Sequence, residues 1–231
     1  SGCPFIIHQG TYQQRCSGYE LTKDLDFDTS GNGEIDSSDA YWNANGEGVS
    51  EGWLPIGDDD INNSFGAYFN GNGYAIKNLT ISRPRTKFVG LFGFIRNAQI
   101  EGLAIAGAHS SVVGDDRVGT LVGYAKASQI RNISIAANVQ GQDFVAGLAG
   151  YLEQGSVENS FASGSVRGNT HIGGLVGASG WGSSIGQSLS TSIVTGNQNT
   201  GGLIGNAGSA EIKNSYWVKD VSTQLESSGS S

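Results

Sequence analysis

Five short runs decide the fold of this chain: VGLFG at residues 89–93, GTLVG at 119–123, AGLAG at 146–150, GGLVG at 173–177 and GGLIG at 201–205. Their closing glycines are separated by 30, 27, 27 and 28 residues. A repeat of nearly fixed length, between about 20 and 50 residues, is typical of a solenoid, in which each repeat buries its apolar face only against its neighbours. The sequence therefore predicts one elongated stack of repeated units.

A strand follows each run. Seven or eight residues after the closing glycine, a β-branched residue opens a segment with the period of two that indicates a β-strand. These residues are Ile100, Ile130, Val157, Ile185 and Ile212, and Ile76 opens a similar segment before the first run. Successive strands lie too far apart for tight hairpins, so we expect them to stack in parallel. The predicted fold is all-β, a right-handed parallel β-helix (a β-solenoid) of about five to six coils with an N-terminal cap.

Stacking in register places like residues above like residues, about 4.8 Å apart. We expect the leucines of the runs to form one buried column and the β-branched residues, Ile76 included, to form another. Glycine, at 37 of 231 residues, is expected at the corners, where positive φ is common. The amides Asn78, Asn132, Asn159, Gln187 and Asn214, with Gly102 as a gap, are expected to form a buried hydrogen-bonded ladder.

The repeat resembles the GLUG motif of bacterial secreted and surface proteins, which include large adhesins and the non-catalytic part of certain immunoglobulin A proteases. The residues that carry the resemblance are the five glycine-leucine runs, residues 130–132, 157–160 and 212–216, and the earlier segments 19–27, 53–57 and 69–79. The resemblance implies a fold and little about activity, because the motif recurs in proteins with different roles. Thr120 replaces a glycine of its run, and we expect that coil to be less regular.

Composition predicts three regions in the chain, and the net charge argues against some classes of partner. We expect residues 1–60 to form a cap, 61–218 to form the coils and 219–231 to form a flexible Ser/Gly tail. The formal net charge of −8 argues against nucleic acid and anionic membrane surfaces as partners. No stretch approaches the roughly 20 apolar residues that a membrane-spanning helix needs.

Both cysteines, Cys3 and Cys16, lie in the irregular N-terminal segment. We expect a disulfide between them, which would stabilise the cap by about 3 kcal/mol in the chain-entropy model. The alternative is a pair of free thiols. His8 lacks the further ligands that a zinc site requires.

A twelve-residue calcium loop is predicted at residues 28–39. Oxygen ligands fall at its positions 1, 3, 5, 7, 9 and 12, as Asp28, Ser30, Asn32, Glu34 (through its carbonyl), Asp36 and Asp39, and Gly33 stands at the tight turn. Ile35 can anchor the loop to the core. Aspartate at position 12 resembles the dockerin form of this loop. We expect a structural Ca²⁺ ion; the alternative is an acidic turn that holds no ion.

Aromatic residues follow this loop. Tyr41, Trp42 and Trp53 precede the first coil. Flat rings beside calcium are a common way to hold sugars, so these three residues are candidate ligand contacts. The alternative is that they cover the open end of the solenoid.

Catalytic residues are harder to place. Asp115, Asp116 and Arg117 precede the second run, and Asp143 and His171 precede the next two. Such a stripe resembles the site of polysaccharide lyases built on β-helices, in which acidic residues hold calcium and a basic residue abstracts the proton next to a uronate carboxylate. The acids come from few coils, and no nucleophile triad can be assembled. We therefore expect a protein that is not an enzyme, with a calcium-dependent lyase as the alternative.

These features together predict a secreted or cell-surface module of an adhesin-type protein. We expect calcium to stabilise it, and we expect it to bind a glycan or an extracellular protein or to serve as a rigid stalk. It is expected to be part of a larger multidomain chain and to have no membrane-inserted segment.

Overall fold

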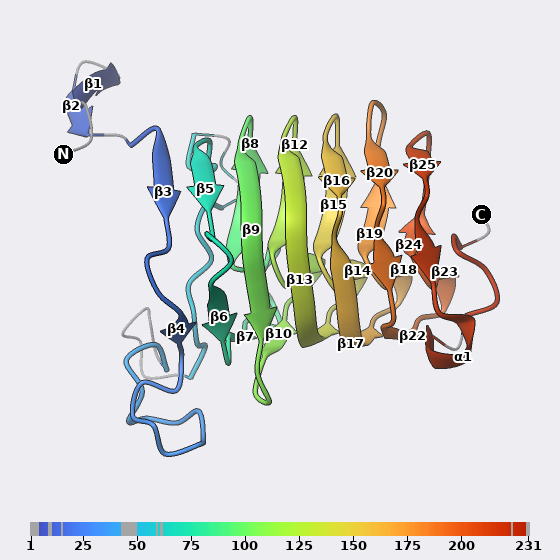
Figure 1. The fold of residues 1–231 in the computed structure, drawn as a ribbon, viewed down its shortest axis with the longest axis horizontal. Helices are drawn as coiled ribbons and strands as arrows, with labels where there is room; N and C mark the ends of the chain where they lie inside the picture. Colours follow the sequence, from blue (N-terminus) through green and yellow to red (C-terminus); the bar gives the residue numbers. More distant parts are fainter. Residues whose placement is uncertain are drawn as a thin grey trace.

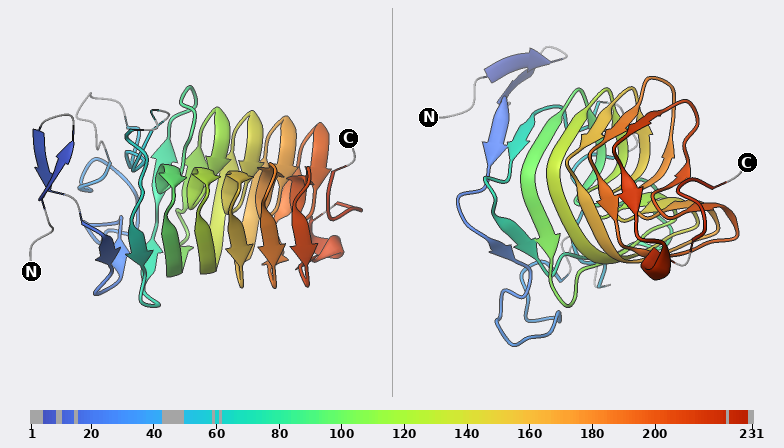
Figure 2. Two further views of the ribbon diagram at one scale, coloured as in Figure 1. Left: turned by 90° about the horizontal axis from the view of Figure 1, so that it is seen from above. Right: turned by 45° about the vertical axis from the view of Figure 1, so that its right-hand side comes forward.

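The structure, a computed structural model, confirms a parallel β-solenoid of about five turns (Figure 1). It describes residues 16–42, 50–58, 60, 62–222 and 224–229, together with the backbone of an antiparallel hairpin, β1 (Phe5–His8) and β2 (Thr11–Gln14). Strands of successive coils lie side by side along the long axis and wrap around it (Figure 2). The core is one continuous cluster of buried apolar side chains inside this wall.

Three parallel sheets form the wall. The long sheet contains β3 (Gly18–Glu20), β4 (Leu25–Asp26), β5 (Tyr68–Asn70), β6 (Ala75–Lys77), β7 (Thr80–Ser82), β9 (Gln99–Ala106), β10 (Ser111–Val113), β13 (Gln129–Gln140), β16 (Ser156–Glu158), β17 (Phe161–Arg167), β20 (Ser184–Gly186), β21 (Leu189–Ser190), β22 (Ile193–Thr195), β25 (Glu211–Lys213) and β26 (Tyr216–Trp217). The four-stranded sheet contains β11 (Asp116–Gly119), β14 (Asp143–Ala146), β18 (Thr170–Gly173) and β23 (Gln198–Gly201). The five-stranded sheet contains β8 (Phe92–Arg96), β12 (Val122–Lys126), β15 (Ala149–Glu153), β19 (Val176–Ser179) and β24 (Ile204–Asn206).

The two predicted apolar columns are present, with one correction. The leucines of the five runs are all buried. In the long sheet, the register aligns Ile100, Ile130, Val157, Ile185 and Ile212. Ile76 is not in this column, because β6 pairs it with Ile105 and β5 places Phe69 beside Ile100. Ile76 occupies the position equivalent to Ile105 and Ile135, and residues 71–74 connect β5 and β6 opposite Gly102 and Leu103.

Glycine turns some corners, as at Gly102 (φ 65°), but the run glycines do not, which narrows the predicted role of glycine. One corner column consists of Phe88, Arg117, Phe144, His171 and Asn199, all with φ between 47° and 60°. None of the glycines in the five runs has a positive φ. They lie where a Cβ would collide with backbone, as at Gly150, where it would lie 2.6 Å from the nitrogen of Val118. Their role is therefore close packing between sheets rather than the turn itself.

The buried amide ladder is also wrong. Asn132, Asn159, Gln187 and Asn214 are exposed and have φ between 47° and 55°. They are corner residues, and asparagine is among the residues that tolerate this left-handed conformation best. Their side chains therefore face solvent instead of one another.

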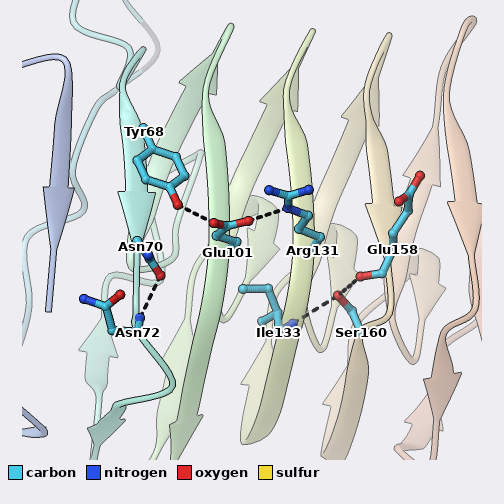
Figure 3. Close-up of polar contacts among 8 residues, drawn as sticks. All are labelled: Tyr68, Asn70, Asn72, Glu101, Arg131, Ile133, Glu158 and Ser160. Atoms are coloured by element: carbon cyan, nitrogen blue, oxygen red, sulfur yellow. Dashed lines mark hydrogen bonds and ion pairs between the residues drawn. The ribbon is translucent and has the colours of Figure 1, made fainter.

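Serine hydroxyls make the bonds that the amides were expected to make. Ser160, Ser188 and Ser215 follow the corner residues and form a serine column. The Ser160 hydroxyl donates to the carbonyl of Glu158 (2.8 Å) and accepts from the Ile133 amide of the preceding coil (3.3 Å) (Figure 3). Ser188 and Ser215 accept in the same way from the amides of Ser160 and Ser188 (3.1 and 3.2 Å).

Thr120 does not disturb the coil that contains it. It is fully buried, and the flanking residues stay in register with both neighbouring coils, as Val118 does with Val145 and Val122 with Phe92 and Ala149. Its hydroxyl has no hydrogen-bond partner among the described residues. The prediction of a less regular coil at Thr120 is therefore not supported.

Both ends of the stack differ from the predicted boundaries. β3 and β4 already pair with β5 and β6, so the long sheet begins at Gly18, inside the predicted cap. At the other end, the described part of the expected flexible tail contains helix α1 (Lys219–Ser222) and a segment that pairs with the last coil. The amides of Gly202 and Leu203 donate to the carbonyls of Glu226 and Ser227 (2.9 and 3.0 Å).

Candidate binding site at the N-terminal end

A pocket lies where β4 ends and the chain leaves the long sheet. It has a volume of about 270 Å³. Its lining consists of Leu21, Lys23, Asp24, Leu25, Asp26, Phe27, Thr29, Tyr41, Trp53, Ile56, Phe69, Ile76, Leu91 and Phe92. The amide of Phe27 still bonds to the next coil, at the carbonyl of Lys77, whereas the Asp26 carboxylate accepts the amide of Asp28 and turns the chain outward. The pocket thus forms between the coils and the loop that departs from them.

Aromatic rings form one wall of this pocket. Phe27, Tyr41 and Trp53 contact one another, with ring centroids 4.8 to 5.7 Å apart in tilted and edge-on arrangements. The Trp53 indole donates to the carbonyl of Leu91 (3.1 Å), which fixes the ring against the first run. Two of the three predicted ligand contacts, Tyr41 and Trp53, are therefore brought together.

Trp42, the third predicted contact, is not among the described residues that line the pocket. The backbone amide of Trp42 donates to the carbonyl of Asp39 (3.2 Å) and belongs to the turn that ends the acidic loop. Tyr41 and Trp42 are neighbours in the chain, but only Tyr41 lines the pocket.

Charged groups stand at the rim of the aromatic wall. Asp24 accepts the amide of Ala75 (2.9 Å) and pairs with the ammonium of Lys77 (2.8 Å). The Ala75 amide, followed by Lys77, lowers the pKa of Asp24, so this carboxylate is ionised at neutral pH. Asp26 accepts from the side-chain amide of Asn78 (2.8 Å). The pocket combines flat apolar rings with fixed hydrogen-bond acceptors, which is the chemistry that orients a small polar ligand.

The acidic loop beside the pocket folds around its own amides. Asp28 accepts from the amides of Gly31 (2.7 Å) and Gly33 (2.9 Å). Asp39 accepts from the amides of Ser30 (2.9 Å) and Asp36 (3.0 Å). Gly33 has a φ of 86°, as the tight turn at position 6 requires.

The remaining loop residues complete this arrangement. Asp36 accepts from the Ser38 hydroxyl and amide, which lower its pKa, and the Asp36 amide does most to lower the pKa of Asp39. Asn32 donates to Asp36 (3.2 Å), and Glu34 is exposed. Ile35 packs against the core, as predicted.

The ligand geometry of a calcium site is not assembled by this loop. Among the described residues, no group of three or more Asp, Glu, His or Cys side chains is arranged to hold a metal ion. Asp28 and Asp39 direct their oxygens at backbone amides instead. The oxygen-rich composition matches what Ca²⁺ prefers, so the calcium site at Asp28, Ser30, Asn32, Glu34, Asp36 and Asp39 stays a prediction.

The corner stripe proposed for lyase chemistry is assembled in part. Register places Asp116 beside Asp143, and Arg117 pairs with Asp116 (2.5 Å). The Arg117 guanidinium lies over four rings, those of Phe88, Tyr124, Phe144 and Tyr151, at 5.1 to 5.9 Å from their centroids. Such contacts hold the cation in place.

Burial affects the titration of this stripe. It raises the pKa of Asp116 and lowers the pKa of His171, whose ring stacks on Phe144 with centroids 4.5 Å apart. Burial and a hydrogen bond to Glu153 raise the pKa of Tyr124. Arg117 does not line the N-terminal pocket. The stripe is a packed corner of the wall.

The sequence reasoning missed part of the pocket. Phe27, Asp24 and Asp26 line it, although in the sequence they stand out only as part of the segment 19–27 that carries the resemblance. The only signal was their position immediately before the acidic loop. Cys3 lies outside the described residues, so its disulfide with Cys16 stays a prediction.

The fold and pocket define a parallel β-solenoid module with a ligand-sized cavity at one end. Residues 145–167 match the model of the GLUG motif. A 74-residue part of the chain is 40% identical to a protein of Evansella cellulosilytica provisionally named as a Gly-rich membrane protein, and covers 31% of this chain and 8% of that protein. A 109-residue part is 34% identical to halomucin of Haloquadratum walsbyi, and covers 46% of this chain and 1% of halomucin. The matches therefore span less than a tenth of either relative.

One solved structure shares the fold. It is a protein of Bacteroides ovatus provisionally described as an immunoglobulin A1 protease, with a TM-score of 0.50, 14% identity, and coverage of 87% of this chain and 68% of that chain. At this identity the likeness concerns the fold alone.

No helix within the described residues has the length and apolarity to span a bilayer.

Proposed function

We propose that this chain is a solenoid module of a secreted or cell-surface adhesin-type protein and that it binds a glycan in the N-terminal pocket. The observation that carries the proposal is the wall formed by Phe27, Tyr41 and Trp53 beside the fixed carboxylates of Asp24 and Asp26. Aromatic faces pack against the apolar faces of sugar rings, and carboxylates accept from their hydroxyls. The alternatives are that the module binds an extracellular protein or that it serves only as a rigid stalk.

The relatives support the location and the modular role. They are named as a membrane protein and as halomucin, and the match covers 8% and 1% of their lengths. A repeat that occupies so small a part of long proteins is suited to be one module among several. We propose that the same holds for the protein to which this chain belongs.

A binding screen tests the pocket. We expect an array of neutral and acidic oligosaccharides to yield a ligand whose affinity falls at least tenfold in Tyr41→Ala, because the exposed ring contributes contact area. Tyr41 is chosen over Trp53 because Trp53 packs against the core. Tyr74→Ala is the matched control, since Tyr74 is 38% exposed against 39% for Tyr41 and lies outside the pocket lining. Equal loss in both variants, or in neither, would refute the pocket assignment.

Calcium is proposed to stabilise the acidic loop. An ion bound only by the folded chain stabilises it by mass action, so millimolar Ca²⁺ should raise Tm by about 2–4 °C. The measurement is a thermal melt in Ca²⁺ and in chelator. The change should disappear in Asp39→Asn and persist in Asp220→Asn, a control in α1. A melt that chelator leaves unchanged would remove calcium from the proposal.

A calcium-dependent lyase is the alternative function, favoured by the ion pair of Arg117 with Asp116 beside Asp143. It would release unsaturated sugar from a uronate polymer, followed by ultraviolet absorbance, and Arg117→Ala would abolish this release. We propose binding without turnover, because four rings restrain Arg117 and a proton-abstracting group needs access to the substrate.

A further inference from the structure

Two adjoining grooves lie on the lateral wall, away from the N-terminal pocket. Their volumes are about 330 and 370 Å³, and they share Gln140 and Arg167. Asn138 lines one groove, and Gln142, Asn169 and Asn197 line the other. We call these six residues the amide groove.

Parallel register arranges the amide groove in columns. Gln140 pairs with Arg167 on the next coil, and Arg167 pairs with Thr195 beyond it. At the adjacent corner, the amide of Asn169 donates to the carbonyl of Gln142 (2.7 Å) and that of Asn197 to the carbonyl of Asn169 (2.9 Å). Polar side chains therefore recur over three successive coils, about 4.8 Å apart along the solenoid axis.

Much of the hydrogen-bonding capacity of this groove is unused. The Asn197 side chain donates to that of Asn169 (2.9 Å), and the Ser165 hydroxyl donates to Asn138 (2.7 Å). The side chains of Gln140 and Gln142 form no hydrogen bond with any other described residue. Each amide offers donors and an acceptor side by side, which suits the hydroxyl groups of a sugar.

Arg167 supplies a positive charge without a carboxylate partner. Among the described residues no acidic oxygen lies within 4.0 Å of its guanidinium, whereas Arg131 pairs with Glu101 on the same sheet (Figure 3). The positions next to Arg167 across the strands are Gln140 and Thr195, which are neutral. The nearest acidic position in these columns, Asp115, precedes Gln142 by one coil. A guanidinium with free donors binds a carboxylate in bidentate fashion.

The geometry points to an acidic oligosaccharide as the ligand of the amide groove, with its carboxylate on Arg167 and its hydroxyls on the flanking amides. The amide groove is a second site that shares no residue with the N-terminal pocket, so this inference goes beyond the glycan binding proposed there. A protein partner fits less well, because binding energy at protein interfaces is concentrated in aromatic and apolar anchors and the six groove residues include none. The net charge of −8 repels long polyanions, which favours short oligosaccharides.

Calorimetry with the intact chain tests this inference. The probes are an oligogalacturonate and its fully methyl-esterified form, which has the same backbone without the carboxylates. We expect the acid to bind at least tenfold more tightly than the ester. Arg167→Gln should abolish this preference and Arg167→Lys should retain part of it. Arg131→Gln is the matched control, because it removes one exposed arginine charge outside the groove and should leave binding unchanged.

Several results would overturn the inference. These are equal binding of acid and ester, unchanged binding in Arg167→Gln, an equal loss in Arg131→Gln, or binding of a poly-glutamate peptide as tight as that of the oligogalacturonate. Asn169→Ala should weaken binding of both acid and ester, which checks the role of the amides if Arg167→Gln folds poorly. Tyr41→Ala distinguishes the two sites: loss of oligogalacturonate binding in Tyr41→Ala but not in Arg167→Gln would place this ligand in the N-terminal pocket and overturn the amide groove. Loss in Arg167→Gln alone supports the groove, and the pocket keeps its own test with the oligosaccharide array.

Discussion

The closing glycine of each run shows how one residue determines the distance between sheets. A Cβ on Gly123 would lie 2.6 Å from the carbonyl carbon of Phe88, and one on Gly205 would lie 2.5 Å from the carbonyl carbon of His171. Both contacts are with backbone at a corner of the preceding coil, where the chain cannot move independently. Glycine is required here because two backbones approach closely, even though its own φ is ordinary.

Gly150→Ala should therefore destabilise the chain. The added methyl would meet the Val118 nitrogen at 2.6 Å, and overpacking of this kind typically costs about 1–3 kcal/mol. Urea unfolding measures the loss. Gly186→Ala is the control, because the nearest atom to its added methyl is a Glu158 side-chain carbon at 3.8 Å. Similar stability for the two variants would contradict the close-packing role of the run glycines.

At the scale of the elements, each strand of the long sheet continues past a corner because side chains carry the hydrogen bonds across it. β16 and β17 are separated by Asn159, whose left-handed conformation interrupts the ladder. Ser160 accepts the Ile133 amide that would otherwise lack a partner at this break. At these three corners, the hydroxyls of the serine column also donate back to the strand before the corner, and so connect its two halves.

Ser160→Ala should lower the free energy of unfolding by about 1–3 kcal/mol, because it leaves the buried Ile133 amide without an acceptor. Ser134→Ala is the control, since Ser134 is exposed on the outer face of β13. Hydrogen exchange provides a local readout: the Ile133 amide should exchange faster in Ser160→Ala and not in Ser134→Ala. An unchanged rate would show that the serine bond is dispensable.

For the whole molecule, the ends of the stack are the vulnerable points, because an open coil exposes both its core and a sheet edge. The C-terminal segment covers this end. Its Ser227 carbonyl accepts the amides of Leu203 and Ile204 (3.0 and 2.9 Å), and the Trp217 indole, packed against the core, donates to Gln224 (3.2 Å).

Removal of residues 223–231 should lower Tm and promote self-association, because it frees the amides of Gly202, Leu203 and Ile204 and uncovers Trp217. Thermal melts and analytical ultracentrifugation measure the two effects. Leu225→Ser is the control: Leu225 is 72% exposed, and its substitution keeps the backbone pairs. A truncated chain as stable and monomeric as the full chain would show that this segment is not a cap.

Only part of the N-terminal pocket could be predicted from the sequence. Tyr41 and Trp53 could be proposed because they stand next to a motif with a known spacing. Asp24, Phe27 and Leu91 could not, since the pocket joins a departing loop to two coils and no periodicity relates them. Trp42 shows the converse, because a residue adjacent to Tyr41 in the chain has no place in the pocket lining.

The amino-acid sequence alone determined the parallel stack and the leucine and isoleucine columns, because each coil repeats the same apolar pattern and stacking places equivalent positions together. The tertiary structure decided which residues turn the corners, the register of Ile76, the serine bonds and the two candidate binding surfaces. Those features depend on how closely the backbones of neighbouring coils approach and on which segments pair. The physical reason is that a repeat specifies burial locally, whereas left-handed corners and pockets arise from contacts between coils.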